Sequence, residues 1–399
     1  MPRINPDILV WARETAGFSL DEGARAVGLK DARGRTGAER LAALERGEEE
    51  PGRPLLLKMA QKYRRPLLTF YLDKAPRKGD RGQDFRTAPG AGPPAYDATV
   101  DALIREINTR QSLVKSLLED EEALPLPFIA SANIAQGAES VATSIRETLR
   151  LNIDEFRRHD SVEAAFKHLR SRIEAAGIFV LLIGNLGSHH SNISPQVFRG
   201  FAIADPIAPF VVINDQDART AWSFTALHEV AHLWLGATGI SGASMEARIE
   251  AFCNDVAGRI LLPGDEIQLL AGVGDVPTDE AIELISSFAE ERRLSRSMVA
   301  YCLLRANIVS MPQWQELKEY FYQEWLDLKA RKREKQKAAE GGPSYYVVRR
   351  DRLGPALLNL VDRSLSEGAI TYTKAGKLLG VKPRNVVPLL RDIPQRGGL

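Results

Sequence analysis

A chain of 399 residues is long enough to form two or three domains with a properly buried core. Its hydrophobic and charged fractions, 44% and 26%, are those of an ordinary soluble globular protein. The formal net charge of +1 excludes a uniformly basic surface, so any surface that binds nucleic acid must be a local patch.

The cysteine count and the first residues indicate the compartment. The chain has only Cys253 and Cys302, which argues against a disulfide framework and against a cysteine-based zinc finger, and fits a reducing environment. The opening stretch, MPRINPDILVWARETAG, contains no apolar core of signal-peptide length, and no apolar run reaches the length of a membrane span. We therefore expect a cytoplasmic protein with no membrane partner.

Residues 1–73 read as five short helices. Ser19 with Glu22, and Thr36 with Glu39, have the spacing of capping boxes and predict two helix starts. Glycines end the predicted helices, and prolines open the last two. Five short helices on one small core are typical of an all-α helix-turn-helix domain.

Residues 74–97 are rich in Gly, Pro, Arg and Lys and predict a basic linker. Its cations could contact phosphate, but we favour a solvated tether.

Residues 98–338 combine helices with a few strands. Helical patterns lead to three β-type runs, IFVLLI, FRGFAIAD and PFVVIND, and helical patterns follow again. This order predicts a mainly α, multidomain protein with an α+β, zincin-like core at residues 178–263.

The C-terminal part follows a second linker, predicted at residues 339–344. Residues 345–399 predict a small helical domain in which two helices flank a glycine turn, as in a helix-turn-helix. Lys382, Arg384 and Arg391 lie in or beside the second of these helices.

The stretch TALHEVAHLWLG contains an H-E-x-x-H motif at residues 228–232. On a helix, residues four apart project from one face, so His228 and His232 can direct both imidazoles at one cation. Glu229 points about a quarter turn away, where it suits a general base better than a ligand. The alternative interpretation is an apolar core helix that happens to contain two histidines.

A catalytic zinc site needs a third protein ligand and an open position for water. The next predicted helix, EARIEAFCND, offers Glu250 as that ligand, with Glu246 one turn earlier in reserve. Asn254 or Asp255 could orient a ligating histidine through its free ring nitrogen. Zinc is the expected metal, and manganese is an alternative because two histidines and a carboxylate suit several metals.

Such a site predicts peptide-bond hydrolysis. Zinc activates a water and polarises the carbonyl, and Glu229 transfers the proton to the leaving amine. The sequence identifies no oxyanion donor, although four residues are candidates: Tyr301, Arg248, Arg292 and Arg293.

Other features admit a functional and a structural interpretation. The run FRGFAIAD could be an edge strand that pairs with an extended peptide, but we favour an ordinary sheet strand. His189 and His190 could bind metal, but exposed loop histidines are the better interpretation. For Cys253 we favour packing as a small buried thiol over a redox or zinc-adjacent role.

The motifs FTALHEVAHLWLG and IEAFCNDVAGRILLP resemble those of the ImmA/IrrE family of cytoplasmic metallopeptidases, over about residues 198–263. The resemblance implies that His228, His232 and Glu250 are the metal ligands and that Glu229 is the catalytic glutamate.

The N-terminal segment, with ERGEEEPGRPLLLKMAQKYRRPLLTFYL, resembles XRE-type, lambda-repressor-like helix-turn-helix domains. The combination implies a role in gene regulation. The implied partners are a repressor or antitoxin-like protein substrate and double-stranded DNA.

Two departures affect the DNA contact. The stretch LKDARGR lengthens the turn before the presumed reading helix, and Glu48, Glu49 and Glu50 after that helix repel phosphate. DNA contact would therefore depend on three arginines: Arg33, Arg35 and Arg40. Dimerisation or partner recognition by the same fold is the alternative, and the basic C-terminal helices are either a second DNA contact or a protein-docking module.

The sequence thus supports two hypotheses. The first is a zinc endopeptidase with an appended DNA-binding domain. The second is a DNA-binding regulator, or a toxin–antitoxin component, whose peptidase-like domain is a sensor or scaffold without proteolysis. A homodimer is compatible with either hypothesis.

Overall fold

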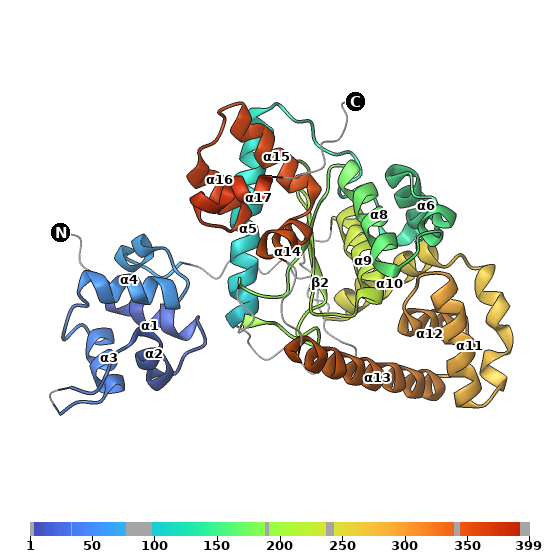
Figure 1. The fold of residues 1–399 in the computed structure, drawn as a ribbon, viewed down its shortest axis with the longest axis horizontal. Coiled ribbons are helices and arrows are strands. Elements are labelled where there is room, and N and C mark those ends of the chain that lie inside the picture. Colours follow the sequence, from blue (N-terminus) through green and yellow to red (C-terminus); the bar gives the residue numbers. More distant parts are fainter. Residues whose placement is uncertain are drawn as a thin grey trace. The chain divides into compact units, whose positions relative to one another are not determined.

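The computed structural model describes residues 4–32, 34–76, 98–187, 191–236, 243–338 and 344–391 (Figure 1). The chain divides into two compact units, and the described residues up to Ile107, together with Ser191, form the first. In the described part the protein is mainly helical with one small sheet. The predicted mainly α, multidomain organisation is confirmed at this level.

The N-terminal unit contains four short α-helices and a 3-10 helix around a small apolar core. Both predicted capping boxes form, with Ser19 and Thr36 each accepting from the backbone N–H three residues on. The connection between the second and third helices is nine residues long, longer than a typical helix-turn-helix turn. The helices are α1 (Pro6–Glu14), α2 (Leu20–Val27), α3 (Gly37–Glu45), α4 (Arg53–Lys62) and η1 (Leu67–Tyr71).

Most of the second unit is a set of helices around one large apolar core. Helix α5 begins among residues grouped with the first unit and continues in the second. The helices before the C-terminal group are α5 (Ala98–Asp120), α6 (Ala138–Leu149), α7 (Ile153–Arg157), α8 (Val162–Ala175), α9 (Trp222–Leu235), α10 (Ala243–Leu261), the 3-10 helix η5 (Glu266–Asp275), α11 (Thr278–Glu291), α12 (Arg296–Arg305) and α13 (Met311–Ala338). Two single 3-10 turns are η2 (Ile134–Gln136) and η4 (Arg219–Ala221).

The three predicted β-type runs form one sheet of order β1-β3-β2. Strand β1 (Phe179–Leu182) pairs in parallel with β3 (Phe210–Ile213), and both are buried along their length. Strand β2 (Gly200–Ile203) pairs antiparallel with β3 and lies at the edge of the sheet. Helix α9 packs against both β2 and β3.

The C-terminal helices belong to the same compact unit as the sheet. They pack on β1 and α8, where the buried Arg170 on α8 donates to the carbonyls of Val180 and Asp351. Glu174, one turn on, accepts from the backbone N–H of Ala356 at 3.1 Å. These helices are α14 (Tyr345–Leu353), α15 (Pro355–Ser366), α16 (Tyr372–Leu379), η6 (Pro383–Asn385) and α17 (Val386–Leu390).

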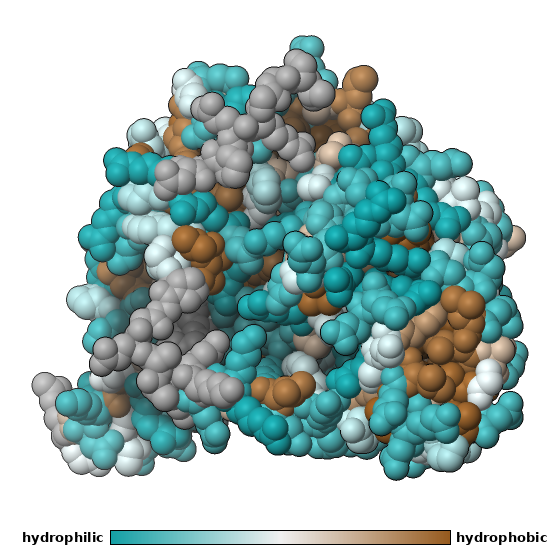
Figure 2. Space-filling model, turned by 45° about the vertical axis from the view of Figure 1, so that its right-hand side comes forward, coloured by the Kyte–Doolittle hydropathy of each residue, from teal (hydrophilic) through white to brown (hydrophobic). Residues whose placement is uncertain are grey.

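The surface is mixed in polarity. Figure 2 shows a face on which hydrophilic residues predominate and apolar residues gather in a few patches. Among the described residues, no helix combines the length and the apolar character needed to cross a bilayer.

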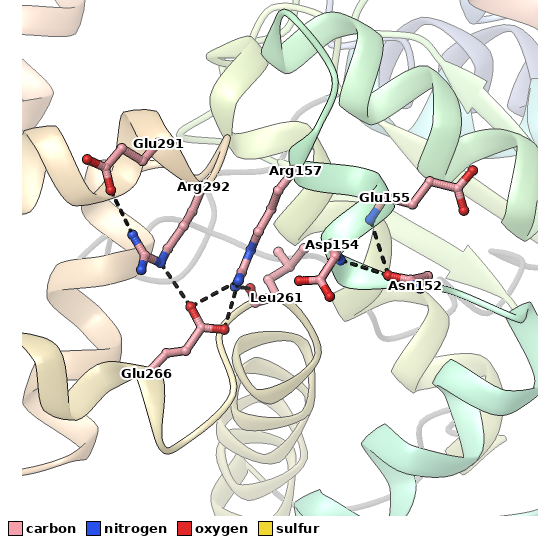
Figure 3. Close-up of polar contacts among 8 residues, drawn as sticks. All are labelled: Asn152, Asp154, Glu155, Arg157, Leu261, Glu266, Glu291 and Arg292. Carbon is pink, nitrogen blue, oxygen red and sulfur yellow. Dashed lines mark hydrogen bonds and ion pairs between the residues drawn. The ribbon is translucent and has the colours of Figure 1, made fainter.

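The carboxylate of Glu266 links three elements of the second unit (Figure 3). Glu266 on η5 accepts from Arg157 on α7 at 2.8 Å and from Arg292, which follows α11, at 2.9 Å. Arg157 also donates to the carbonyl of Leu261 at the end of α10. Burial raises the pKa of Glu266, but the hydrogen bonds from the two arginines outweigh it, so the pKa lies below its ordinary value.

A lowered pKa makes the contribution of Glu266 to stability dependent on pH. The contribution is fully present above the pKa of the unfolded chain, about 4.3, and is lost as the pH falls through the lower folded value. We expect Glu266→Gln to lower the free energy of unfolding by about 1–3 kcal/mol at pH 7, and by less near pH 3.

Chemical denaturation at the two pH values measures this difference. Glu291→Gln is the matched control, because Glu291 pairs with the same Arg292 but its side chain is 69% exposed. The control should cost less than about 0.5 kcal/mol. If both variants lose the same free energy of unfolding at both pH values, the ion pairs of Glu266 do not stabilise the fold as proposed.

Candidate metal centre

Helix α9 carries both histidines of the H-E-x-x-H motif and is buried from Trp222 to Trp234. Its apolar side chains pack into the large core, and α8, α10, β2 and β3 surround it. His228, Glu229 and His232 are each at most 2% exposed. Because buried polar side chains are costly unless they have a partner, three of them on one turn indicate a built site.

The end of α9 is fixed by an upstream segment. The backbone N–H groups of Ala130 and Ala132 each donate at 2.9 Å to the last carbonyls of the helix, those of Leu233 and Trp234. The Trp234 ring stacks on Phe128, with ring centroids 4.4 Å apart. These contacts satisfy carbonyls that a helix end leaves open, and they hold the turn that carries His232.

The structure brings the three predicted ligands together. The Nε2 atoms of His228 and His232 lie 3.0 Å apart. The Glu250 carboxylate on α10 places Oε2 3.3 Å from Nε2 of His228 and Oε1 3.3 Å from Nε2 of His232. Helix α10 supplies Glu250 because it packs along α9.

These separations fit one small cation. Zinc bonds to nitrogen and oxygen are about 2.1 Å long, so two donors of a tetrahedral site lie about 3.4 Å apart. The three separations here are 3.0, 3.3 and 3.3 Å. The histidine and carboxylate donors therefore already have the spacing of a metal centre.

The electrostatics at Glu250 favour its charged form. Burial raises the pKa of Glu250, but hydrogen bonds to His228 and His232 outweigh it, and the pKa lies far below the ordinary range. The carboxylate is thus an anion, which is the form that binds a cation.

Glu229 lies against the edge strand. A Cβ atom built on Gly200, the first residue of β2, would lie 2.6 Å from Oε1 of Glu229 and 2.7 Å from Cγ2 of Thr225. Only glycine allows the strand backbone to approach the helix this closely. The contact places the Glu229 carboxylate against the first residue of the edge strand.

Asn254 and Asp255, which were predicted to orient a ligating histidine, have no hydrogen bond to either histidine among the contacts of the described residues. The side-chain oxygen of Asn254 is buried and has no hydrogen-bond partner among the described residues, so its predicted bond to a histidine does not form. Asp255 does not face the histidines: its carboxylate accepts from Arg305 at 2.6 Å and from Tyr301 at 3.3 Å, both on α12. The side chain of Glu246, the reserve ligand, lies outside the described part of the chain.

Three of the four oxyanion candidates have other contacts. Tyr301 donates to Asp255, Arg292 binds Glu266, and Arg293 donates to the carbonyl of His159. Arg248 is exposed on α10. The structure therefore directs Tyr301, Arg292 and Arg293 to contacts other than the histidines and Glu250.

The residues predicted to contact DNA lie in the N-terminal unit. Arg35 is exposed and lies 3.5 Å from Glu49, and Arg40 donates to the carbonyl of Lys30 at 2.6 Å. Arg33 falls outside the described residues, as do His189 and His190.

A comparison with known protein families finds a match that includes the residues of this site. Residues 181–304 match the Peptidase_M78 family model, described as an IrrE N-terminal-like domain. The match covers β2, β3, α9, α10 and nearly all of α12, and it supports an activity of the metallopeptidase kind. No curated protein and no solved structure matches the chain.

Gly200 is a residue of this site that the motifs in the sequence do not identify. The signal was present, because a glycine inside the β-type run FRGFAIAD marks a place where another group approaches the backbone closely. The sequence of this strand does not show that the approaching group is Glu229.

We expect Gly200→Ala to lower the free energy of unfolding by about 1–3 kcal/mol, because the added methyl overlaps Glu229 and Thr225. Gly264→Ala is the matched control, since a Cβ at Gly264 meets nothing within 4 Å. Thermal and urea unfolding of the two variants measures the difference, and equal stability would show that β2 does not lie against Glu229.

Proposed function

We propose that this protein is a zinc-dependent endopeptidase that cleaves a specific regulatory protein. The observation that carries the proposal is the convergence of His228, His232 and Glu250 at zinc-ligand spacing, with Glu229 next to His228 on the same buried helix. The match of residues 181–304 to a peptidase family supports the same conclusion.

The donor set suits zinc, with manganese as an alternative. Two neutral imidazoles and one carboxylate would hold the ion and leave a coordination position open. A bound zinc ion acts as a Lewis acid and makes water a stronger nucleophile at neutral pH.

Glu229 supplies the proton transfer. Hydrolysis adds a water oxygen to the carbonyl carbon and breaks the C–N bond, so one proton must move from the water to the leaving nitrogen. Glu229 accepts this proton and returns it to the amine, as a general base and then a general acid. Its packing against Gly200 limits where its carboxylate can lie, which favours one orientation for both steps.

The edge strand suits a polypeptide substrate. Strand β2 lies at the edge of the sheet and begins at the residue that contacts Glu229. An extended peptide that pairs with an edge strand is held by its main chain, with selectivity left to alternate side chains. The metal and Glu229 would then lie beside the bound backbone.

The regulatory part of the proposal depends on the N-terminal unit. Its five short helices resemble a repressor-like module, and this favours a repressor or antitoxin-like protein as substrate. DNA contact by this unit is a separate proposal, and the pairing of Arg35 with Glu49 and of Arg46 with Glu48 counts against it. We therefore do not assign it as a second function.

Metal content tests the ligand set. We expect about one equivalent of zinc in the purified wild type, and Glu250→Ala should bind zinc at least 100-fold more weakly, because even an outer contact to a ligand is worth about 10–100-fold. Glu283→Ala is the matched control, an exposed glutamate on α11 that should leave metal content unchanged.

The metal is measured by elemental analysis and by competition with a chelator. Retention of wild-type affinity in Glu250→Ala would rule out Glu250 as a ligand, and so would equal loss in Glu283→Ala.

Proteolysis tests the role of Glu229. Glu229→Gln should keep the metal but slow cleavage by about 100- to 10,000-fold, because the amide cannot accept the proton. The substrates to try are the products of adjacent genes, above all any repressor or antitoxin, and new N-termini are identified by mass spectrometry. Cleavage at the wild-type rate by Glu229→Gln would overturn the mechanism, and no cleavage by the wild type would favour a sensor or scaffold.

A further inference from the structure

The C-terminal helices concentrate positive charge that the chain as a whole does not have. Residues 344–391 contain nine Lys and Arg but three Asp and Glu, a net charge of +6 against +1 for the entire chain. A local excess of this size is a feature of surfaces that bind polyanions.

Seven of these nine cations fall into two groups. Four arginines serve the fold: Arg349 and Arg350 donate to backbone carbonyls at the ends of α16 and α17, while Arg352 and Arg363 form ion pairs with Asp215 and Glu121. By contrast, Lys377, Lys382 and Arg384 are exposed and have no ion pair within the described part of the chain. The second group is therefore available to a ligand.

The available cations surround one open pocket of about 660 Å³. Lys377 comes from α16, and Lys382 and Arg384 come from the turn and η6 that follow it. Thr373, Asn385 and Tyr345 line the same pocket and add hydrogen-bonding groups and an exposed aromatic ring. Cations with short polar donors are the set that contacts phosphate and sugar in nucleic-acid complexes.

The backbone around the pocket has the geometry of a helix-turn-helix. Helix α16 ends at Leu379, and its C-cap Gly380 has φ +61°. Residues 380–382 separate it from the 3-10 turn η6, which α17 follows directly. The turn folds back closely on α16, because a Cβ on Gly376 would lie 2.7 Å from the carbonyl oxygen of Val381 in the turn. A turn of three residues is typical of the DNA-binding motif, whereas the N-terminal unit has nine.

We infer that α16, η6 and α17 form a site for double-stranded DNA, in which Lys377, Lys382 and Arg384 bind the phosphate backbone. The proposal is independent of the peptidase activity. It assigns the nucleic-acid contact to the C-terminal helices, where Lys377, Lys382 and Arg384 have no ion pair within the described residues, and not to the N-terminal unit, where Arg35 and Arg46 pair with Glu49 and Glu48.

The test uses the full-length protein and a fluorescein-labelled 30-base-pair duplex. Fluorescence anisotropy at several salt concentrations should show that affinity falls as salt rises. In the triple variant Lys377→Gln/Lys382→Gln/Arg384→Gln, we expect the slope of log affinity against log salt to decrease by about 2–3, and affinity at 50 mM salt to fall at least 100-fold.

Two further variants distinguish binding at this pocket from a general effect of the protein's net charge. Lys58→Gln/Lys62→Gln/Lys167→Gln removes three exposed lysines elsewhere and should keep wild-type affinity. Lys377→Arg/Lys382→Arg/Arg384→Lys preserves charge in the pocket and should bind within a few-fold of the wild type. Circular dichroism checks that each variant is folded.

Unchanged affinity in the pocket variant would overturn the inference, and so would an equal loss in the distant one. The same anisotropy assay with competing polyaspartate, single-stranded RNA or inorganic phosphate distinguishes other ligands. Stronger competition by polyaspartate or RNA than by unlabelled duplex would assign the pocket to an acidic protein or to RNA. Full competition by millimolar phosphate at constant ionic strength would reduce it to a small-anion site.

Discussion

The packing of α10 along α9 is the contact on which the candidate metal centre depends. Two histidines four residues apart converge through helix geometry alone, but a third ligand requires a second element at the right height. Glu250 reaches both imidazoles at 3.3 Å because apolar residues of α10, among them Cys253, Val256 and Ala257, join the same core as α9. The apolar packing of the two helices thus sets the position of a polar site.

The same geometry separates what the sequence could and could not predict at this site. The pairing of His228 with His232 was predictable, because it follows from the helical period within one segment, whereas the meeting of Glu250 with them depends on how α10 packs along α9. Asn254 is one turn after Glu250 and shares its face, but a shared face does not determine which atoms a side chain meets. Asp255 lies about 100° further round the helix and is bound by Arg305, a partner fifty residues away that no local pattern reveals.

A sequence shows which side chains are charged, but it does not show which of them form ion pairs. Arg35 and the acidic run after α3 were visible, and the structure adds that Glu49 lies within 3.5 Å of Arg35. In the C-terminal segment the sequence could not sort the cations into structural and available ones. That distinction depends on carbonyls and carboxylates far along the chain, such as Asp215 for Arg352.

The small three-stranded sheet contacts helices of the second unit along both of its edge strands. Its β1 edge contacts α14 and α15, and its β2 edge contacts α9. On the β1 side, Arg170 bonds to the carbonyls of Val180 and Asp351, and on the β2 side Gly200 meets Glu229. Since β3 pairs with both edge strands, it connects the strand that contacts the C-terminal helices to the strand that contacts α9. The described residues before and after the predicted linker at 339–344 belong to one compact unit, in which α14 and α15 pack on β1.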